Sequence, residues 1–178
     1  MAFRIMDTKL EWLAETERPK VGDILVIPAN DHLWMLSGPG LEFKKILGKE
    51  IELEAVRQGP LEPGALAVTS GEPLGYRFLF HGVVTRQDLN WVPGAGRQAV
   101  QAAVARAGRE KASSMILYPL YRGVHGRRED PAREMLAAFL SGLEAGSTLR
   151  QVSILCGQPD EKTMLHATML RLLGEAHA

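Results

Sequence analysis

The stretch Asp23-Ile24-Leu25-Val26-Ile27-Pro28-Ala29-Asn30, followed by Ser37-Gly38-Pro39-Gly40, decides the fold class of this chain. Residues 24–29 form a continuous apolar run of strand length, which is typical of a central strand buried on both faces of a sheet. The strand ends on a polar asparagine, and a glycine-containing loop then opens a helix with Pro39 in its first turn. Backbone N–H groups at the start of a helix attract anions, so this segment predicts a site for a phosphate-bearing small molecule.

The rest of the chain predicts alternating strands and helices. The capping box Thr8-Lys9-Leu10-Glu11 predicts a short helix that runs to about residue 15, and the spacing of Phe43, Ile46 and Leu47 places them on one helix face. We expect further strands at residues 3–6, 65–69, 77–84, 114–119 and 151–156, and further helices at 51–58, 93–110, 131–143 and 160–174. The strands at 65–69 and 77–84 are close enough in sequence to pair antiparallel. This order predicts one α/β domain over residues 1–178, with a mixed, mostly parallel sheet covered by helices on both faces.

Composition narrows the class of protein. The 178 residues carry 21 basic and 21 acidic side chains, and this balance argues against general nucleic-acid binding, which usually needs a basic face. The single cysteine, Cys156, excludes an internal disulfide and a Cys-rich metal site, and it fits a reducing cytoplasm. The histidines lack metal-ligand spacing, so we expect no metal. No signal-peptide pattern and no apolar run of roughly 20 residues is visible, so we expect a cytoplasmic protein without membrane contact.

Three loops follow the expected strands at the carboxyl edge of the sheet, at residues 30–40, 120–129 and 156–160. Ligands bind at this edge in open α/β sheets. The glycines in these loops either let a ligand approach the backbone closely or serve only as turn residues. The shared position of the loops predicts a pocket between them.

The chain resembles the macro domain family, which binds ADP-ribose. Residues 23–30 align without a gap with the family pattern Asp-Ala-Ile-Val-Asn-Ala-Ala-Asn, and Ser37-Gly38-Pro39 falls on the family's glycine loop. Residues 63–71 resemble its Gly-Glu-Ala-Val-x-Thr-x-Gly strand, and residues 77–81 resemble its Tyr-Val-Ile-His strand. Residues 115–126 are similar to its second phosphate loop. The resemblance implies a three-layer α/β/α sandwich with an ADP-ribose cleft and no further cofactor.

The resemblance also implies roles for matching positions. Asn30 would face the distal ribose, Asp7 would bind the adenine amino group, and Cys156 would lie near the adenine and its ribose. The pyrophosphate would be wrapped by residues of the two loops, namely Ser37, Gly38, Pro39, Arg122, Gly123, Val124, His125 and Gly126. The implied partner is ADP-ribose or a derivative, and an ADP-ribosylated protein could carry it.

The chain departs from the family pattern at several positions. Ile27 replaces an asparagine, Pro39 removes one N–H from the glycine loop, and Arg122 would either pair with a phosphate or plug the cleft. Gly40 stands where the hydrolytic branch has an aspartate, which argues against that chemistry. Three functions stay open: a reader of ADP-ribose, a hydrolase that uses Asp31, His32 or His125, and an interaction domain with a vestigial cleft.

Overall fold

The computed structural model describes residues 2–121 and 129–175. Seven strands form one sheet, in the order β1-β2-β7-β6-β3-β5-β4. The strands are β1 (Ala2–Ile5), β2 (Thr8–Ala14), β3 (Gly22–Asn30), β4 (Leu66–Ser70), β5 (Tyr76–Thr85), β6 (Ser114–Leu117) and β7 (Gln151–Cys156). The helices are α1 (Gly38–Leu47), α2 (Glu50–Val56), α3 (Ala95–Arg109), α4 (Glu129–Glu144) and α5 (Pro159–Glu175), with short 3₁₀ turns η1 (Glu15–Glu17) and η2 (Glu72–Leu74).

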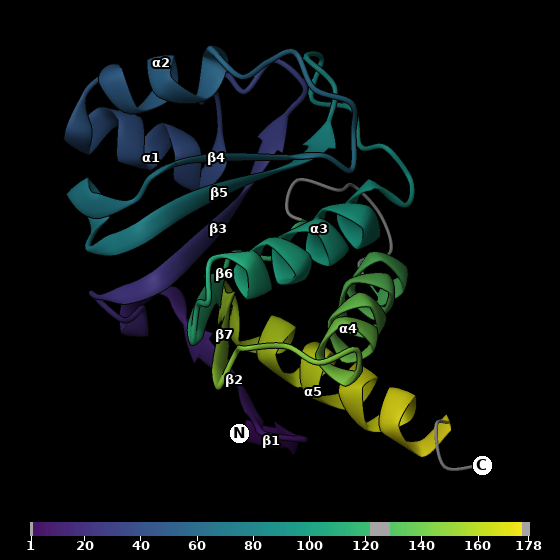
Figure 1. The fold of residues 1–178 in the computed structure, drawn as a ribbon. Coiled ribbons are helices and arrows are strands. Elements are labelled where there is room, and N and C mark those ends of the chain that lie inside the picture. Colours follow the sequence, from purple (N-terminus) through teal and green to yellow (C-terminus); the bar gives the residue numbers. More distant parts are fainter. Residues whose placement is uncertain (1, 122–128, 176–178) are drawn as a thin grey trace.

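The central strand β3 explains the layering. Ile24 and Val26 pack into the core under α3, α4 and α5, whereas Leu25 and Ile27 pack toward α1 and α2. Successive strand residues point to opposite faces, so an unbroken apolar run is what a strand between two helical layers requires. Figure 1 shows α1 and α2 on one side of the sheet and α3, α4 and α5 on the other. The expected three-layer α/β/α sandwich is confirmed.

The sheet is mixed and mostly parallel, as expected. Strands β2, β7, β6, β3 and β5 run parallel to one another. At the two edges, β1 pairs antiparallel with β2, and β4 pairs antiparallel with β5. The pairing of β4 with β5 confirms the predicted antiparallel pair. The carboxyl ends of the parallel strands therefore meet at one edge, where the loops after them lie together.

The predicted helix over residues 8–15 is wrong, because this segment is strand β2. Thr8, Leu10 and Trp12 are buried at alternate positions, which is the period of a strand rather than of a helix. Thr8 does not cap a helix, since its hydroxyl donates to the carbonyl of Leu149, 2.7 Å away. The segment thus carries two conflicting signals, a capping box that favours a helix and a two-residue period that favours a strand. Its pairing with β7 selects the strand.

The helices otherwise follow the sequence pattern closely. One further correction concerns α1, where Phe43 is 3% exposed but Ile46 is 75% exposed. Ile46 therefore lies outside the buried face that the spacing predicted, and only Phe43 and Leu47 pack into the core beneath α1. Helix α4 begins at Glu129, so Asp130 lies in its first turn rather than before it.

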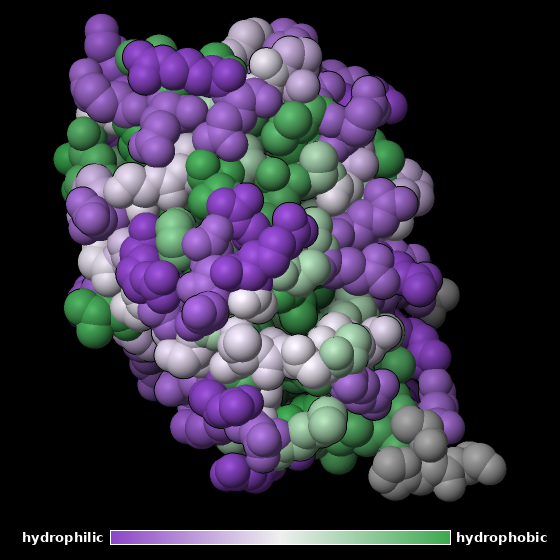
Figure 2. Space-filling model, in the orientation of Figure 1, coloured by the Kyte–Doolittle hydropathy of each residue, from purple (hydrophilic) through white to green (hydrophobic). Residues whose placement is uncertain are grey.

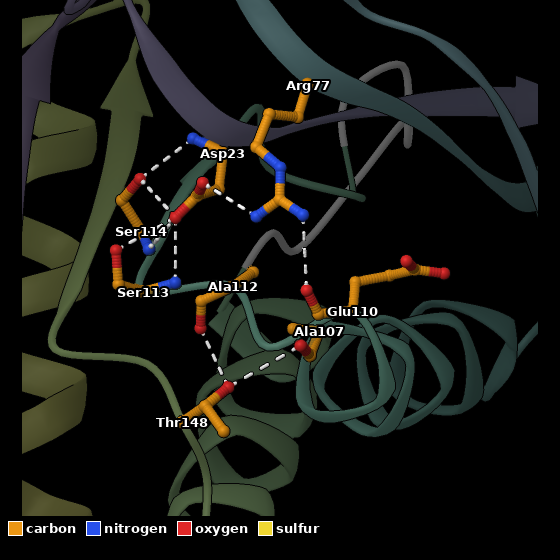
Figure 3. Close-up of polar contacts among 8 residues, drawn as sticks. All are labelled: Asp23, Arg77, Ala107, Glu110, Ala112, Ser113, Ser114 and Thr148. Carbon is orange, nitrogen blue, oxygen red and sulfur yellow. Dashed lines mark hydrogen bonds and ion pairs between the residues drawn. The ribbon is translucent and has the colours of Figure 1, made fainter.

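The amino edge of the sheet is held by the carboxylate of Asp23 (Figure 3). Backbone N–H groups of Ser113 and Ser114 donate to Asp23 Oδ2 at 2.7 and 3.1 Å, the Ser113 hydroxyl donates at 2.9 Å, and Arg77 pairs with Oδ1 at 3.1 Å. Burial alone would raise the pKa of this carboxyl, but the hydrogen bonds outweigh it and lower the pKa from 3.8 to about 2. Asp23 thus joins β3, β5 and β6 at the edge opposite the loops that follow the parallel strands.

The surface is mixed in polarity. On the face shown in Figure 2, apolar side chains are scattered between polar ones. Among the described helices, none is both long enough and apolar enough to cross a bilayer.

Candidate functional site

A cavity of about 340 Å³ opens at the carboxyl ends of β3 and β5. The residues that line it come from the end of β3, the β3–α1 loop, the start of α1, the second half of β5 and the loop after β5. They are Ile27, Pro28, Ala29, Asn30, Leu33, Trp34, Met35, Ser37, Gly38, Pro39, Gly40, His81, Val84, Thr85 and Leu89. The predicted residues Asn30, Ser37, Gly38 and Pro39 are therefore brought together at one cavity. No side chain of this described lining carries a charge at neutral pH, since burial keeps His81 neutral.

Asn30 is 3% exposed and its side chain organises the loop that follows β3. Its Oδ1 accepts hydrogen bonds from the backbone N–H groups of His32 and Trp34, at 3.1 and 3.2 Å. Its Nδ2 donates to the carbonyl of Trp34 at 2.7 Å. One amide thus satisfies three backbone groups that no strand or helix partner could reach. The asparagine was predicted to face a ribose; what the structure shows is that it fixes the shape of the cavity wall.

Two further contacts hold this loop. Leu33 adopts a left-handed backbone conformation with φ +61° while its side chain is 1% exposed. A leucine in that conformation costs about 1–2 kcal/mol, so packing must outweigh the strain. From α2, Glu52 accepts the backbone N–H of Met35 at 2.8 Å and pairs with Lys44 at 2.6 Å. The loop is therefore held from both ends by side chains outside it.

The start of α1 forms the polar side of the cavity. Ser37 occupies the N-cap position but makes no capping hydrogen bond with its hydroxyl, and Pro39 lies in the first turn. The N–H groups of Gly38 and Gly40 belong to this first turn, which has no intrahelical partners for them. Two backbone donors, one hydroxyl and the positive end of the helix dipole thus belong to residues that line the cavity. This is the arrangement that binds an anion.

His81 on β5 forms the inner wall beside Ile27, its neighbour in the parallel register. The side chain is 1% exposed, and its Nε2 lies 2.9 Å from the hydroxyl oxygen of Thr69 on β4. Burial lowers the pKa of His81 from 6.5 to about 4, so the ring is neutral at physiological pH. His81 was not named as a site residue from the sequence, so its place in the cavity wall was missed.

The loop after β5 was also missed as part of the site. Thr85 ends β5, and Leu89 lines the cavity with φ +61° and 45% of its surface exposed. The turn is closed by Asp88, which accepts hydrogen bonds from the backbone and side chain of Asn90 at 3.0 and 2.6 Å. The Asp-Leu-Asn sequence is a turn signal, but no local pattern shows that the turn folds over the end of β3.

The proposed acid–base residues Asp31 and His32 do meet. Oδ1 of Asp31 lies 2.9 Å from Nδ1 of His32, and the His32 ring packs against Trp34 with centroids 5.2 Å apart. Neither residue is among those that line the cavity. The pair therefore belongs to the loop that Asn30 holds but is not part of the described cavity lining.

The structure corrects the placement of Asp7. It lies in the turn between β1 and β2, at the amino end of β2, because the expected helix after it is a strand. This is the sheet edge opposite the cavity. The residue that follows the carboxyl end of β2 is Glu15, which begins η1. Cys156 does end β7 at the carboxyl edge and is 4% exposed, but it is not part of the cavity wall described above.

The second expected phosphate loop, with Arg122, Gly123, Val124, His125 and Gly126, lies outside the described residues. Glu161 on α5, which is 5% exposed, connects two segments at the carboxyl edge of the sheet. Glu161 accepts the hydroxyl of Tyr121 at 2.9 Å and the backbone N–H of Gly157 at 2.7 Å. This buried carboxylate joins the ends of β6 and β7 through α5.

Within residues 2–121 and 129–175, no group of His, Cys, Asp and Glu side chains could hold a metal ion.

Comparison with known proteins begins with sequence. No family model matches the chain. An uncharacterised protein of Aquifex aeolicus is 29% identical over 118 residues, which cover 64% of this chain and 70% of that protein. An uncharacterised protein of Aeropyrum pernix is 31% identical over 124 residues, which cover 67% of this chain and 66% of that protein.

Solved structures show a likeness over nearly the whole chain. A macrodomain of Oceanobacillus iheyensis with ADP superposes with a TM-score of 0.81 at 20% identity, covering 98% of this chain and 97% of that one. A Trypanosoma brucei macrodomain in complex with ADP gives a TM-score of 0.76 at 20% identity, covering 92% and 70%. The T. brucei macrodomain in complex with ADP-ribose gives 0.69 at 21% identity, covering 85% and 63%. The seven-stranded sheet between two helical layers, with a cavity at its carboxyl edge, is the fold of a macrodomain.

Proposed function

We propose that the chain binds ADP-ribose or a closely related nucleotide in the cavity at the carboxyl ends of β3 and β5. The observation that carries the proposal is the start of α1, where Ser37, Gly38 and Gly40, with the donors of a first helical turn, line a cavity. Macrodomains of the same fold bind ADP and ADP-ribose, and a pyrophosphate is the group that such a helix start favours.

The departures from the family pattern are compatible with an open cavity. Ile27 and Pro39 line it and leave about 340 Å³ free, so neither side chain fills it. Pro39 costs one N–H donor at the helix start, which weakens the anion site without removing it. The cleft is therefore not vestigial at this end.

We also propose that the physiological ligand is carried by a protein partner in the cytoplasm.

Calorimetric titration tests the proposal. ADP-ribose should bind more tightly than AMP and NAD, and binding should weaken in an Asn30→Ala variant because the loop that shapes the cavity loses its anchor. Gln101→Ala, which removes an exposed amide on α3 outside the cavity wall, is the matched control. Absence of heat at millimolar ADP-ribose, which corresponds to less than about 4 kcal/mol of binding free energy, would refute the proposal.

One observation favours a second function, the release of ADP-ribose from a substrate. The Asp31 carboxylate orients the His32 ring at 2.9 Å, as an acid–base pair requires. Because neither residue of the pair lines the cavity, we rank this function second. Release of ADP-ribose from an ADP-ribosylated protein by the wild type but not by His32→Gln would support it. No release over long incubation at high enzyme concentration would exclude it.

A further inference from the structure

Of the two ring nitrogens of the buried His81, Nε2 has a hydrogen-bond partner among the described residues and Nδ1 has none. Nε2 interacts with Thr69, whose own hydroxyl can donate to the carbonyl of Leu79 at 3.5 Å. When Thr69 donates to that carbonyl, its oxygen accepts the proton of Nε2. Nδ1 is then the unprotonated nitrogen, which is a hydrogen-bond acceptor.

Nδ1 makes no hydrogen bond within the described residues, yet it is not sealed off. The fully enclosed side-chain nitrogens that lack a partner there are Trp12 Nε1 and His166 Nδ1. Since His81 Nδ1 is not one of them, this atom has accessible surface, and the space that His81 lines is the cavity. The nitrogen without a partner thus belongs to a ring that is 1% exposed and lies in the cavity wall.

The cavity wall contains two chemically distinct groups. The start of α1 supplies the donors of Gly38 and Gly40, which suit a phosphate. The inner wall beside Ile27 supplies an uncharged acceptor, which repels phosphate oxygen but suits a hydroxyl or an N–H group. We propose that Nδ1 of His81 accepts a hydrogen bond from an uncharged hydroxyl or N–H group of the bound nucleotide, and so determines which nucleotides fit. This inference rests on the proposed function and adds the residue that reads the ligand's uncharged end.

Two substitutions separate this role from a structural one. A glutamine amide reaches the position of Nε2 and keeps the contact with Thr69, but it places nothing at Nδ1. An asparagine amide reaches the position of Nδ1 and keeps an acceptor there, but it loses Thr69. His81→Gln should therefore fold normally and bind about three- to tenfold more weakly, as expected for one lost hydrogen bond. His81→Asn should be less stable but keep its affinity within about twofold.

Calorimetry with ADP-ribose and with ADP, on the wild type and both variants, completes the test. Weaker binding of ADP-ribose alone by His81→Gln places the terminal sugar at His81, and weaker binding of both ligands places the nucleoside there; either result supports the proposal. Equal affinity of His81→Gln and wild type, or an equal loss in both variants, overturns it while the proposed function stands. Failure of the wild type to bind either ligand overturns both. Ring ¹⁵N shifts of His81 should show the proton on Nε2 in the free protein, and a proton on Nδ1 would contradict the acceptor role.

Discussion

Replacing Asn30 with alanine should destabilise the protein even in the absence of ligand. The substitution removes three hydrogen bonds, two accepted by Oδ1 from His32 and Trp34 and one donated by Nδ2 to Trp34. Each such bond contributes about 0.5–1.5 kcal/mol net. The loop is partly exposed, so water can satisfy some of the released groups, and we expect a total loss of about 2–3 kcal/mol.

Urea denaturation measures this loss directly. For a domain of this size the slope is roughly 2 kcal/mol per molar urea, so the midpoint of Asn30→Ala should fall by about 1–1.5 M. Gln101→Ala is again the control, because its amide is exposed on α3 and the loss of stability should stay within about 0.5 kcal/mol. Hydrogen exchange of the His32 and Trp34 amides should accelerate by about 30- to 100-fold in Asn30→Ala.

The alternative is that Asn30 serves only as a ligand contact. Its removal would then leave the stability of the free protein unchanged, or raise it, since binding residues are often not optimised for stability. A free-energy change below about 0.5 kcal/mol, together with unchanged exchange of the two loop amides, would refute the reasoning from the three hydrogen bonds.

Three further predictions concern other positions. His81 has a pKa of about 4 in the folded protein, against 6.5 ordinarily. Between these pH values the unfolded chain binds a proton that the folded protein does not, so the stability falls by up to about 3 kcal/mol as the pH drops from about 6.5 to 4. Urea midpoints at pH 7 and 5 should show this fall in the wild type and not in His81→Gln. The pKa of Asp23 is lowered to about 2, so the ionised carboxylate stabilises the folded protein by about 1–2 kcal/mol after solvent screening. This stabilisation is present above pH 4 and is lost as the pH falls toward 2. Asp23→Asn should show the same loss at pH 7, and equal stability of wild type and variant there would contradict the prediction. Gly40→Asp would place a Cβ 3.3 Å from Met35, a contact that the flexible methionine can relieve; a loss of roughly 1 kcal/mol is expected by thermal unfolding, and complete failure to fold would show that the wall cannot adjust.

Local patterns were sufficient where the burial of a segment follows from its own residues. The apolar run of β3 predicted a strand between two layers, because such a run has no polar face to leave in water. The apolar spacing of α3, α4 and α5 predicted helices for the same reason. The antiparallel pair of β4 and β5 followed from the short connection between them.

Local patterns failed where two signals competed or where the partner is distant in sequence. The segment at 8–14 carries both a capping box and a period-2 pattern, and its pairing with β7 and the bond from Thr8 to Leu149, 141 residues away, select the strand. The same choice moved Asp7 to the far edge of the sheet. Ile46 kept its helical position, but the neighbouring elements leave that side of α1 uncovered.

The amino-acid sequence by itself determined the α/β class, the order of most elements and the loop that opens α1, because these depend on hydrophobic periodicity and turn residues within short segments. Only the tertiary structure decided how the site is built. Asn30 became the anchor of a loop, Leu89 came to line the cavity from the turn after β5, and His81 became a buried, neutral part of its wall. These properties arise from burial and from contacts between strands that are far apart in the chain, and no local pattern encodes either one.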